Sequence, residues 1–98
     1  MRETKAATPE TLRAEMTRAL DDIQSDHRKH LDVLELLGRI EEMQIPAEAL
    51  PAMAAACREA AERIRVAMER ASDLDWSSLN SLQRVAESVA TSLERRPR

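Results

Sequence analysis

The chain contains 98 residues and has a mass of 11.1 kDa, a length that predicts one domain because domains usually contain about 50 to 250 residues. Its 16 Ala residues, its single Gly and the absence of Phe and Tyr favour helices and argue against an all-β or α/β fold. The formal net charge of -3 argues against a general nucleic-acid-binding protein, which needs a basic surface to displace counterions from phosphates.

The first predicted element is one long helix over residues 9–43. Residues 1–8 are polar and we expect them to be flexible, although Thr8 can cap the helix and Pro9 suits its first position. No Pro follows until position 46, so the helix can extend for about 52 Å. From Met16 onward, positions 16, 20, 23, 27, 30, 34 and 37 step by four and three and predict a heptad seam. The apolar residues of the helix are Leu12, Met16, Leu20, Ile23, Leu31, Leu34, Leu37 and Ile40.

This seam is uneven along its length. It is densest around Leu34 and Leu37, which we expect to be buried, whereas Leu12 lies near the frayed end and should contribute less. Between Asp21 and His30 the sequence contains one apolar residue, Ile23, and two histidines take seam positions there.

The second half of the chain predicts a helical hairpin. Pro46 ends the long helix, and Pro51 is suited to begin a second helix over residues 51–71. The connection 72–75 is short and places a third helix, 76–95, antiparallel to the second. Asp75 is the expected cap, and Leu74 and Leu79 have the spacing of a hydrophobic staple.

These elements predict an all-α fold with a long N-terminal helix and an antiparallel hairpin, a three-helix bundle within a single domain over residues 9–98. The long helix exceeds the two hairpin helices by more than ten residues, so part of its seam would stay uncovered. We therefore expect dimerisation or a partner helix to complete the bundle.

The pair His27 and His30 has the spacing that places two imidazoles on one helical face, where they could bind a metal ion or respond to pH. The sequence shows no third ligand nearby, although two copies of the pair could meet in an antiparallel dimer. The simpler interpretation puts Leu31 in the core and leaves the polar tips of both histidines in water. We therefore assign no metal ligand and no cofactor.

No residue combination predicts catalysis, so we do not expect an enzyme. Cys57 lies mid-helix among alanines and is interpreted as a small core residue. The chain contains no glycine-rich phosphate loop, and its serines are typical of caps and turns. Trp76 is the one aromatic residue; we favour an anchor for the hairpin tip over an exposed binding residue.

The sequence therefore predicts a small non-enzymatic protein-interaction module, such as an adaptor, chaperone or regulatory subunit. The expected layout is similar to that of several small helical chaperones and adaptors, in architecture alone. We expect a cytoplasmic protein that binds itself or a protein partner, with no nucleic acid, membrane or small-molecule substrate. The alternatives are a histidine-based metal-binding or pH-sensing protein and a small inhibitor protein of a mobile element. The predicted protein-binding residues are Met16, Leu20, Ile23, His27, His30, Leu34, Leu37 and Trp76.

Overall fold

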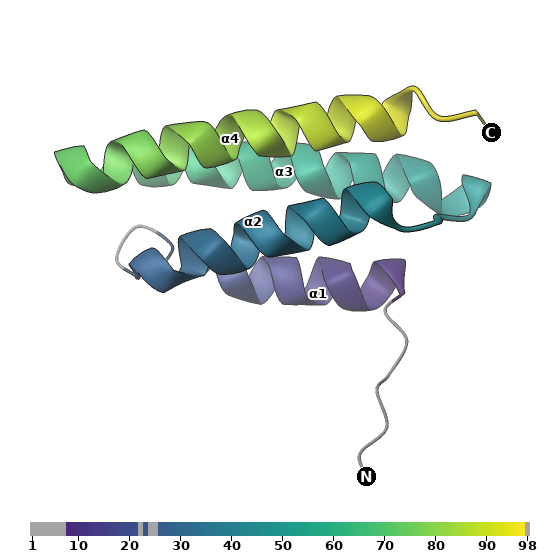
Figure 1. The fold of residues 1–98 in the computed structure, drawn as a ribbon, viewed down its shortest axis with the longest axis horizontal. Coiled ribbons are helices and arrows are strands. Elements are labelled where there is room, and N and C mark those ends of the chain that lie inside the picture. The colour runs from purple at the N-terminus through teal and green to yellow at the C-terminus, as the bar shows by residue number, and fades with distance from the viewer. Residues whose placement is uncertain (1–7, 22, 24–25, 98) are drawn as a thin grey trace, which may run out of the picture.

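The computed structural model describes residues 8–21, 23 and 26–97, and this part of the chain is helical, which confirms the all-α prediction (Figure 1). No helix within it has the length and apolar character needed to cross a membrane. The described helices are α1 (Pro9–Leu20), α2 (His27–Glu42), the short 3₁₀ helix η1 (Ala47–Ala49), α3 (Leu50–Met68) and α4 (Asp73–Glu94).

The prediction of one continuous helix over residues 9–43 is wrong, because the helix is interrupted between α1 and α2. The backbone is extended at Asp21, and at Asp26 the side chain accepts a 3.1 Å hydrogen bond from the Arg28 N–H, which caps α2. Ile23, which lies between the two helices in the sequence, is buried. Asp and Ser residues favour caps and turns over helix interiors, and this preference prevails over the continuing apolar spacing.

The beginning of α1 is defined by a reciprocal cap. The Thr11 N–H donates to Thr8 Oγ1 at 3.2 Å, and the Thr8 N–H donates to Thr11 Oγ1 at 2.9 Å. Pro9 follows in the first turn, where its missing N–H costs nothing. Thr8 is therefore an ordered cap and not part of a flexible segment, while residues 1–7 of that predicted segment lie outside the described residues.

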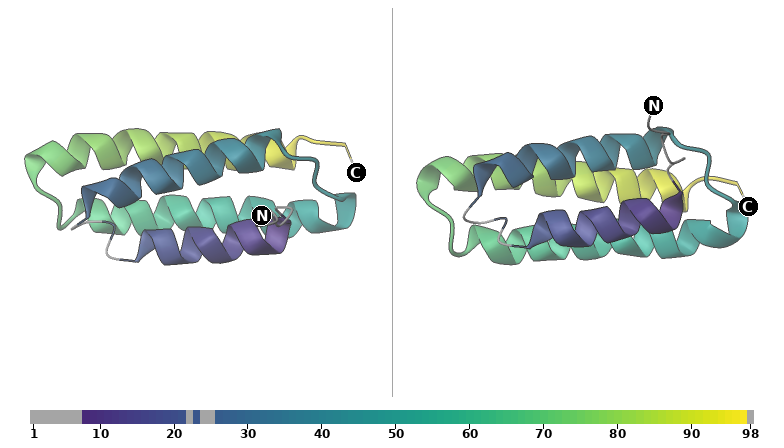
Figure 2. Two further views of the ribbon diagram at one scale, coloured as in Figure 1. Left: turned by 60° about the horizontal axis from the view of Figure 1, so that its bottom comes forward. Right: turned by 90° about the horizontal axis from the view of Figure 1, so that it is seen from below.

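The break converts the expected three-helix arrangement into two helical hairpins. One hairpin is α1 with α2 and the other is α3 with α4; α1 also contacts α3, and α2 contacts α4 (Figures 1 and 2). The helices are 12, 16, 19 and 22 residues long. Neither α1 nor α2 is longer than α3 or α4, so the excess length of the first helix on which the uncovered seam depended is absent.

The second hairpin begins with a different cap from the one predicted. Ser72 is the N-cap of α4, and its hydroxyl accepts from the Asp75 N–H at 3.4 Å, so α4 starts three residues before the expected Trp76. Leu74 is 88% exposed and makes no hydrophobic staple with the buried Leu79. A serine hydroxyl that accepts a backbone N–H of the first turn is a favoured N-cap, and it sets the helix start here.

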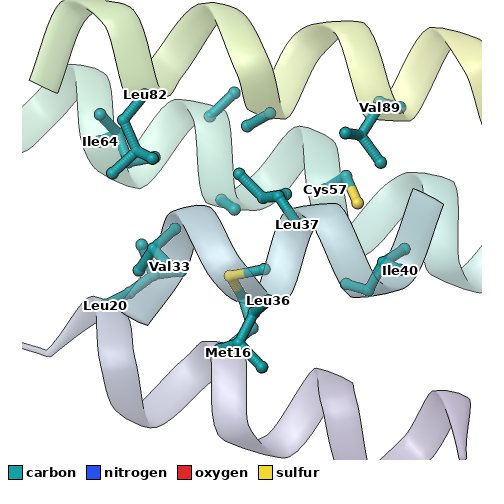
Figure 3. Packing of buried hydrophobic residues seen from close by; sticks show 14 of the residues in the cluster. Met16, Leu20, Val33, Leu36, Leu37, Ile40, Cys57, Ile64, Leu82 and Val89 are labelled. Carbon is teal, nitrogen blue, oxygen red and sulfur yellow. The ribbon is translucent and has the colours of Figure 1, made fainter. Parts of the chain in front are cut away.

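All four α-helices contribute to one buried apolar cluster (Figure 3). Leu37 lies at its centre as expected, but Leu12 is also buried, at 1% exposure, whereas Leu34 is 45% and Leu31 62% exposed. The expectations for Leu12 and Leu34 are therefore wrong. Because α2 begins afresh at His27, its inward face is set by contact with α1 and α4, and consists of His30, Val33, Leu36, Leu37 and Ile40.

At the opposite end of the molecule from the break, Arg96 joins the end of α4 to the end of α2. Its guanidinium donates to the main-chain carbonyl of Met43 at 3.0 Å and to that of Glu41. The last carbonyls of a helix have no partner within the helix. Arg96 therefore caps α2 from another element and holds the two hairpins together at this end.

We predict that replacing Leu12 by Ala lowers the free energy of unfolding by about 2–5 kcal/mol, because a cavity is left in addition to the lost apolar burial. The matched control is Val66→Ala on α3, where Val66 is 44% exposed, and its cost should stay below about 1 kcal/mol. Urea denaturation measures both. Equal small losses for the two variants would contradict the burial of Leu12.

Candidate functional site

His30 is a buried polar side chain, 3% exposed, and both of its ring nitrogens have partners. Nε2 lies 3.0 Å from the main-chain oxygen of Ile23, and Nδ1 lies 2.9 Å from Ser78 Oγ. A carbonyl oxygen can only accept, so Nε2 carries a hydrogen and donates it. In the neutral ring, Nδ1 then has the free electron pair and accepts from the Ser78 hydroxyl. The expectation that both histidines leave their polar tips in water is wrong for His30.

His27 lies one turn before His30, in the first turn of α2, and its side chain is 66% exposed. Its Nδ1 is 3.4 Å from Asp75 Oδ1 on α4, and its ring centroid is 4.8 Å from that of His30. Asp75 Oδ2 accepts from the Ser72 hydroxyl at 3.4 Å, so its second oxygen is already engaged. One ligand atom from each of His27, His30 and Asp75 lies within 4.8 Å of the others. We call these three residues the His–Asp cluster.

The partners of the two histidines were not identified from the sequence. Asp75 was interpreted as a helix cap and Ser78 as a turn serine, and each lies 48 residues from its histidine. A separation of this size can be recognised only once α4 is known to pack beside α2. The available signal is weak, because Asp and Ser in the first turns of a helix are most often capping residues.

The folded chain covers most of the predicted protein-binding seam with its own helices. His27, Leu34 and Trp76 remain exposed, and Trp76 is 47% exposed, so it does not serve as a buried anchor. The residues buried in the core are Met16, Leu20, Ile23, His30 and Leu37. These five are unavailable to a partner in this fold, which corrects the expectation that the seam itself is the binding surface.

The exposed large apolar side chains belong to the parts of the helices nearest the His–Asp cluster. Two come from the first turns of α2, two from the first turn of α4 and one from the last turn of α3 (Figure 1). These elements meet at the end of the molecule that carries the break between α1 and α2. The residues are Leu31, Leu34, Leu74, Trp76 and Val66.

A shallow hollow of about 490 Å³ lies at the same end, between the end of α1 and α3. Leu20, Ile23 and Val66 contribute its apolar lining, and Arg63 Nη2 forms a 3.0 Å ion pair there with Asp21 Oδ1. This ion pair joins the first hairpin to the second. The hollow is open to solvent and holds no close grouping of polar side chains other than this pair and its charged neighbours Glu62 and Arg70.

On the other side of α3 a charged contact connects that helix to α4. Arg58 donates to both carboxylate oxygens of Glu94, at 2.8 and 3.0 Å, and to Thr91 Oγ1 at 3.2 Å. The hydrogen bonds from Arg58 lower the pKa of Glu94 below its ordinary value. The arrangement is an exposed bidentate pair, and we interpret it as a contact between helices and not as a reactive site.

Cys57 is buried in the core, as predicted, and burial raises its pKa to about 11. The thiolate is the reactive form of cysteine, so the native side chain is a poor nucleophile at neutral pH. We predict that the folded chain reacts with iodoacetamide at pH 8 at least about 100-fold more slowly than the chain unfolded in urea. Mass spectrometry of quenched samples measures the two rates, and equal rates would contradict this burial.

Comparison of the chain with known protein families, curated proteins and solved structures finds no match.

We predict that His30→Ala lowers the free energy of unfolding by about 1–3 kcal/mol, because the Ile23 carbonyl and the Ser78 hydroxyl lose a buried partner. His27→Ala is the matched control on the same helix, and its cost should be below about 0.5 kcal/mol because the side chain is exposed. Thermal unfolding followed by circular dichroism compares the two variants. A His30→Ala variant as stable as His27→Ala would mean that the buried hydrogen bonds contribute nothing.

Proposed function

We propose that this chain is a non-enzymatic interaction module that associates with a second copy of itself through one helical face. The face is formed by two adjacent stripes, which we call the α2–α4 face. Its residues are Leu31, Leu34 and Gly38 on α2 and Leu74, Ser78, Ser81, Val85 and Ser88 on α4.

Helical periodicity and the observed contacts place these residues together. On α2 the residues 31, 34 and 38 step by three and four, and on α4 the residues 74, 78, 81, 85 and 88 do the same, so each set lies on one side of its helix. His27 contacts Asp75 and His30 contacts Ser78, which shows that these sides flank the junction of α2 with α4. Leu31 and Leu34 are therefore solvent-exposed beside that junction.

The α2–α4 face differs from the rest of the surface in charge. Charged residues make up 34% of the chain, yet none of the eight residues of this face is charged. Four of them are Gly or Ser, whose small side chains permit a second helix to approach closely. An uncharged surface with protruding leucines is typical of the buried centre of an interface.

Gly38 is the observation that carries the proposal. It lies in the interior of α2 and is exposed, and a Cβ atom built on it would meet nothing within 4 Å. Gly in a helix interior costs about 1 kcal/mol relative to Ala, and no contact among the described residues requires its small size. A backbone approaching from another molecule supplies that requirement.

A second copy is the occupant that fits best. The face has no charge that would call for a partner of opposite charge, and its leucines and small residues are complementary to each other. Around a two-fold axis near Gly38, the leucines of one copy would lie over the small residues of the other, as an isologous interface requires. Association through this face takes the role that the sequence assigned to the seam of the predicted helix over residues 9–43, and it suits an adaptor, chaperone or regulatory subunit.

We predict that Leu34→Asp weakens dimerisation at least about tenfold, because it places an unpaired charge in the interface. Val66→Asp on α3 is the matched control, since Val66 is exposed to nearly the same extent, 44% against 45% for Leu34, and lies outside the α2–α4 face. Sedimentation equilibrium over a range of concentrations gives the dissociation constants.

Gly38 provides an independent comparison within the same measurement. Gly38→Leu should weaken the dimer because its side chain fills the space of the approaching backbone. The proposal would be overturned if the parent chain stays monomeric at concentrations about 100-fold above the micromolar range. It would also be overturned if the Gly38→Leu variant dimerises as tightly as the parent. Capture of a different protein by this face would favour a heterologous partner over a second copy.

A further inference from the structure

We propose that His27, His30 and Asp75 form a binding site for one divalent transition-metal ion of the Zn²⁺ class. This inference does not depend on self-association, because all three ligands belong to one chain. It rests on the short distances between the ligand atoms: one imidazole nitrogen from each of His27 and His30 and one carboxylate oxygen of Asp75 lie within 4.8 Å of one another.

The donor set determines the class of ion. Imidazole nitrogens suit Zn²⁺, Ni²⁺, Co²⁺ and Cu²⁺, whereas Mg²⁺ and Ca²⁺ prefer oxygen ligands alone. Two histidines and one carboxylate are a frequent set of protein ligands in zinc sites that keep a further position open for water. The exposed side of His27 faces solvent, so water has access to that open position.

The tautomer of His30 is already the one that a metal ligand needs. Its Nε2–H donates to the Ile23 carbonyl at 3.0 Å, which leaves the electron pair on Nδ1, the nitrogen that faces Ser78 on α4. A hydrogen bond from the second ring nitrogen to a main-chain carbonyl is the usual support of a metal-ligating histidine. Burial of the ring at 3% exposure holds it in this orientation.

Asp75 is supported in the same manner. Its Oδ2 accepts from the Ser72 hydroxyl at 3.4 Å, and its Oδ1 faces His27 Nδ1 at 3.4 Å. One oxygen is thus restrained by the cap of α4 while the other is available as a ligand. The buried ligand His30 and the half-buried ligand Asp75 are therefore oriented before an ion arrives. Preorganisation of this kind favours binding.

The closure that the ion requires is small. Ligand atoms about 2.0–2.2 Å from a tetrahedral ion lie about 3.4 Å from one another, so the largest separation of 4.8 Å must shorten. His27 is the exposed member of the cluster and can supply this movement by rotating its side chain. The Ser78 hydroxyl must release Nδ1, since it bonds the electron pair that the ion would take.

Isothermal titration calorimetry of the full chain with ZnCl₂ tests the site, and Co²⁺ absorption reports the coordination geometry. We expect one ion per chain and an increase in the unfolding temperature with Zn²⁺. His27→Gln and Asp75→Asn should each weaken binding by about 100-fold or more, since the loss of a direct ligand should cost at least as much as the loss of a supporting residue. Asp73→Asn, which removes a charge from the same turn of α4, should leave the affinity unchanged.

Ser78→Ala separates this site from general attraction of cations to the surface. It removes the hydrogen bond that competes for His30 Nδ1, so it should tighten Zn²⁺ binding by about fivefold. No measurable heat or Co²⁺ spectrum with the parent chain would overturn the proposal. Equal Zn²⁺ affinity in the parent, His27→Gln and Asp75→Asn chains would also overturn it. The same holds if Asp73→Asn loses as much Zn²⁺ affinity as the two ligand variants. The site is judged by metal affinity in the parent, His27→Gln, Asp75→Asn and Asp73→Asn chains, and the dimer by sedimentation of the metal-free parent, Leu34→Asp and Gly38→Leu chains, so failure of this site and failure of the proposed dimer are distinguishable.

Discussion

The rest of the structure depends on the turn between α1 and α2, held by the hydrogen bond from His30 Nε2 to the carbonyl of Ile23. Without the turn, α1 and α2 would be one helix, and part of its apolar seam would lie beyond the reach of α3 and α4. With it, the chain folds back and buries Leu12, Met16 and Leu20 against its own helices. A single polar side chain, buried and satisfied on both nitrogens, thus stabilises the connection that closes the core.

The same turn sets the rotation of α2 and so decides what the surface contains. A continuous helix would have placed Leu34 on the inward seam with Leu20 and Ile23. After the break, Val33 and Leu36 face inward together with His30 and Leu37, and Leu31 and Leu34 are exposed. The proposed interface is therefore a consequence of the core arrangement, because the side chains displaced from the seam are those that form the uncharged surface around Gly38.

The junction of α2 and α4 combines two proposed properties in one region. The first turns of both helices meet there, so capping residues such as Asp75 lie near the histidines. Acidic residues are favoured at the beginnings of helices for electrostatic reasons, and the fold gives one of them a further contact. At the opposite end, Arg96 caps α2 through main-chain carbonyls alone. Side chains of α2 and α4 contact each other at one end of the molecule, and an arginine binds main-chain carbonyls at the other. The first of these ends offers side-chain ligands.

Local patterns in the sequence determined the helical class, the cap at Thr8 with Pro9, the start of α3 near Pro51 and the burial of Cys57. Each depends on propensity, proline geometry or residues within one or two turns. The break between α1 and α2 had a local signal as well, in the Asp and Ser residues of the sequence there, but the seam spacing continued across it and favoured one helix. Both patterns were compatible with the sequence, and the preference of Asp and Ser for caps and turns prevails in the folded chain.

The approach of Asp75 and Ser78 to the histidines, the exposure of Leu34 and the burial of His30 were decided by the tertiary structure alone. All three depend on which side of α2 faces α4, and that rotation is set by contacts between residues nearly 50 positions apart. Helical spacing identifies the residues that share a face, but it does not state which element that face will meet. The sequence by itself therefore determined the elements and much of the core, and only the tertiary structure determined the candidate site and the candidate interface.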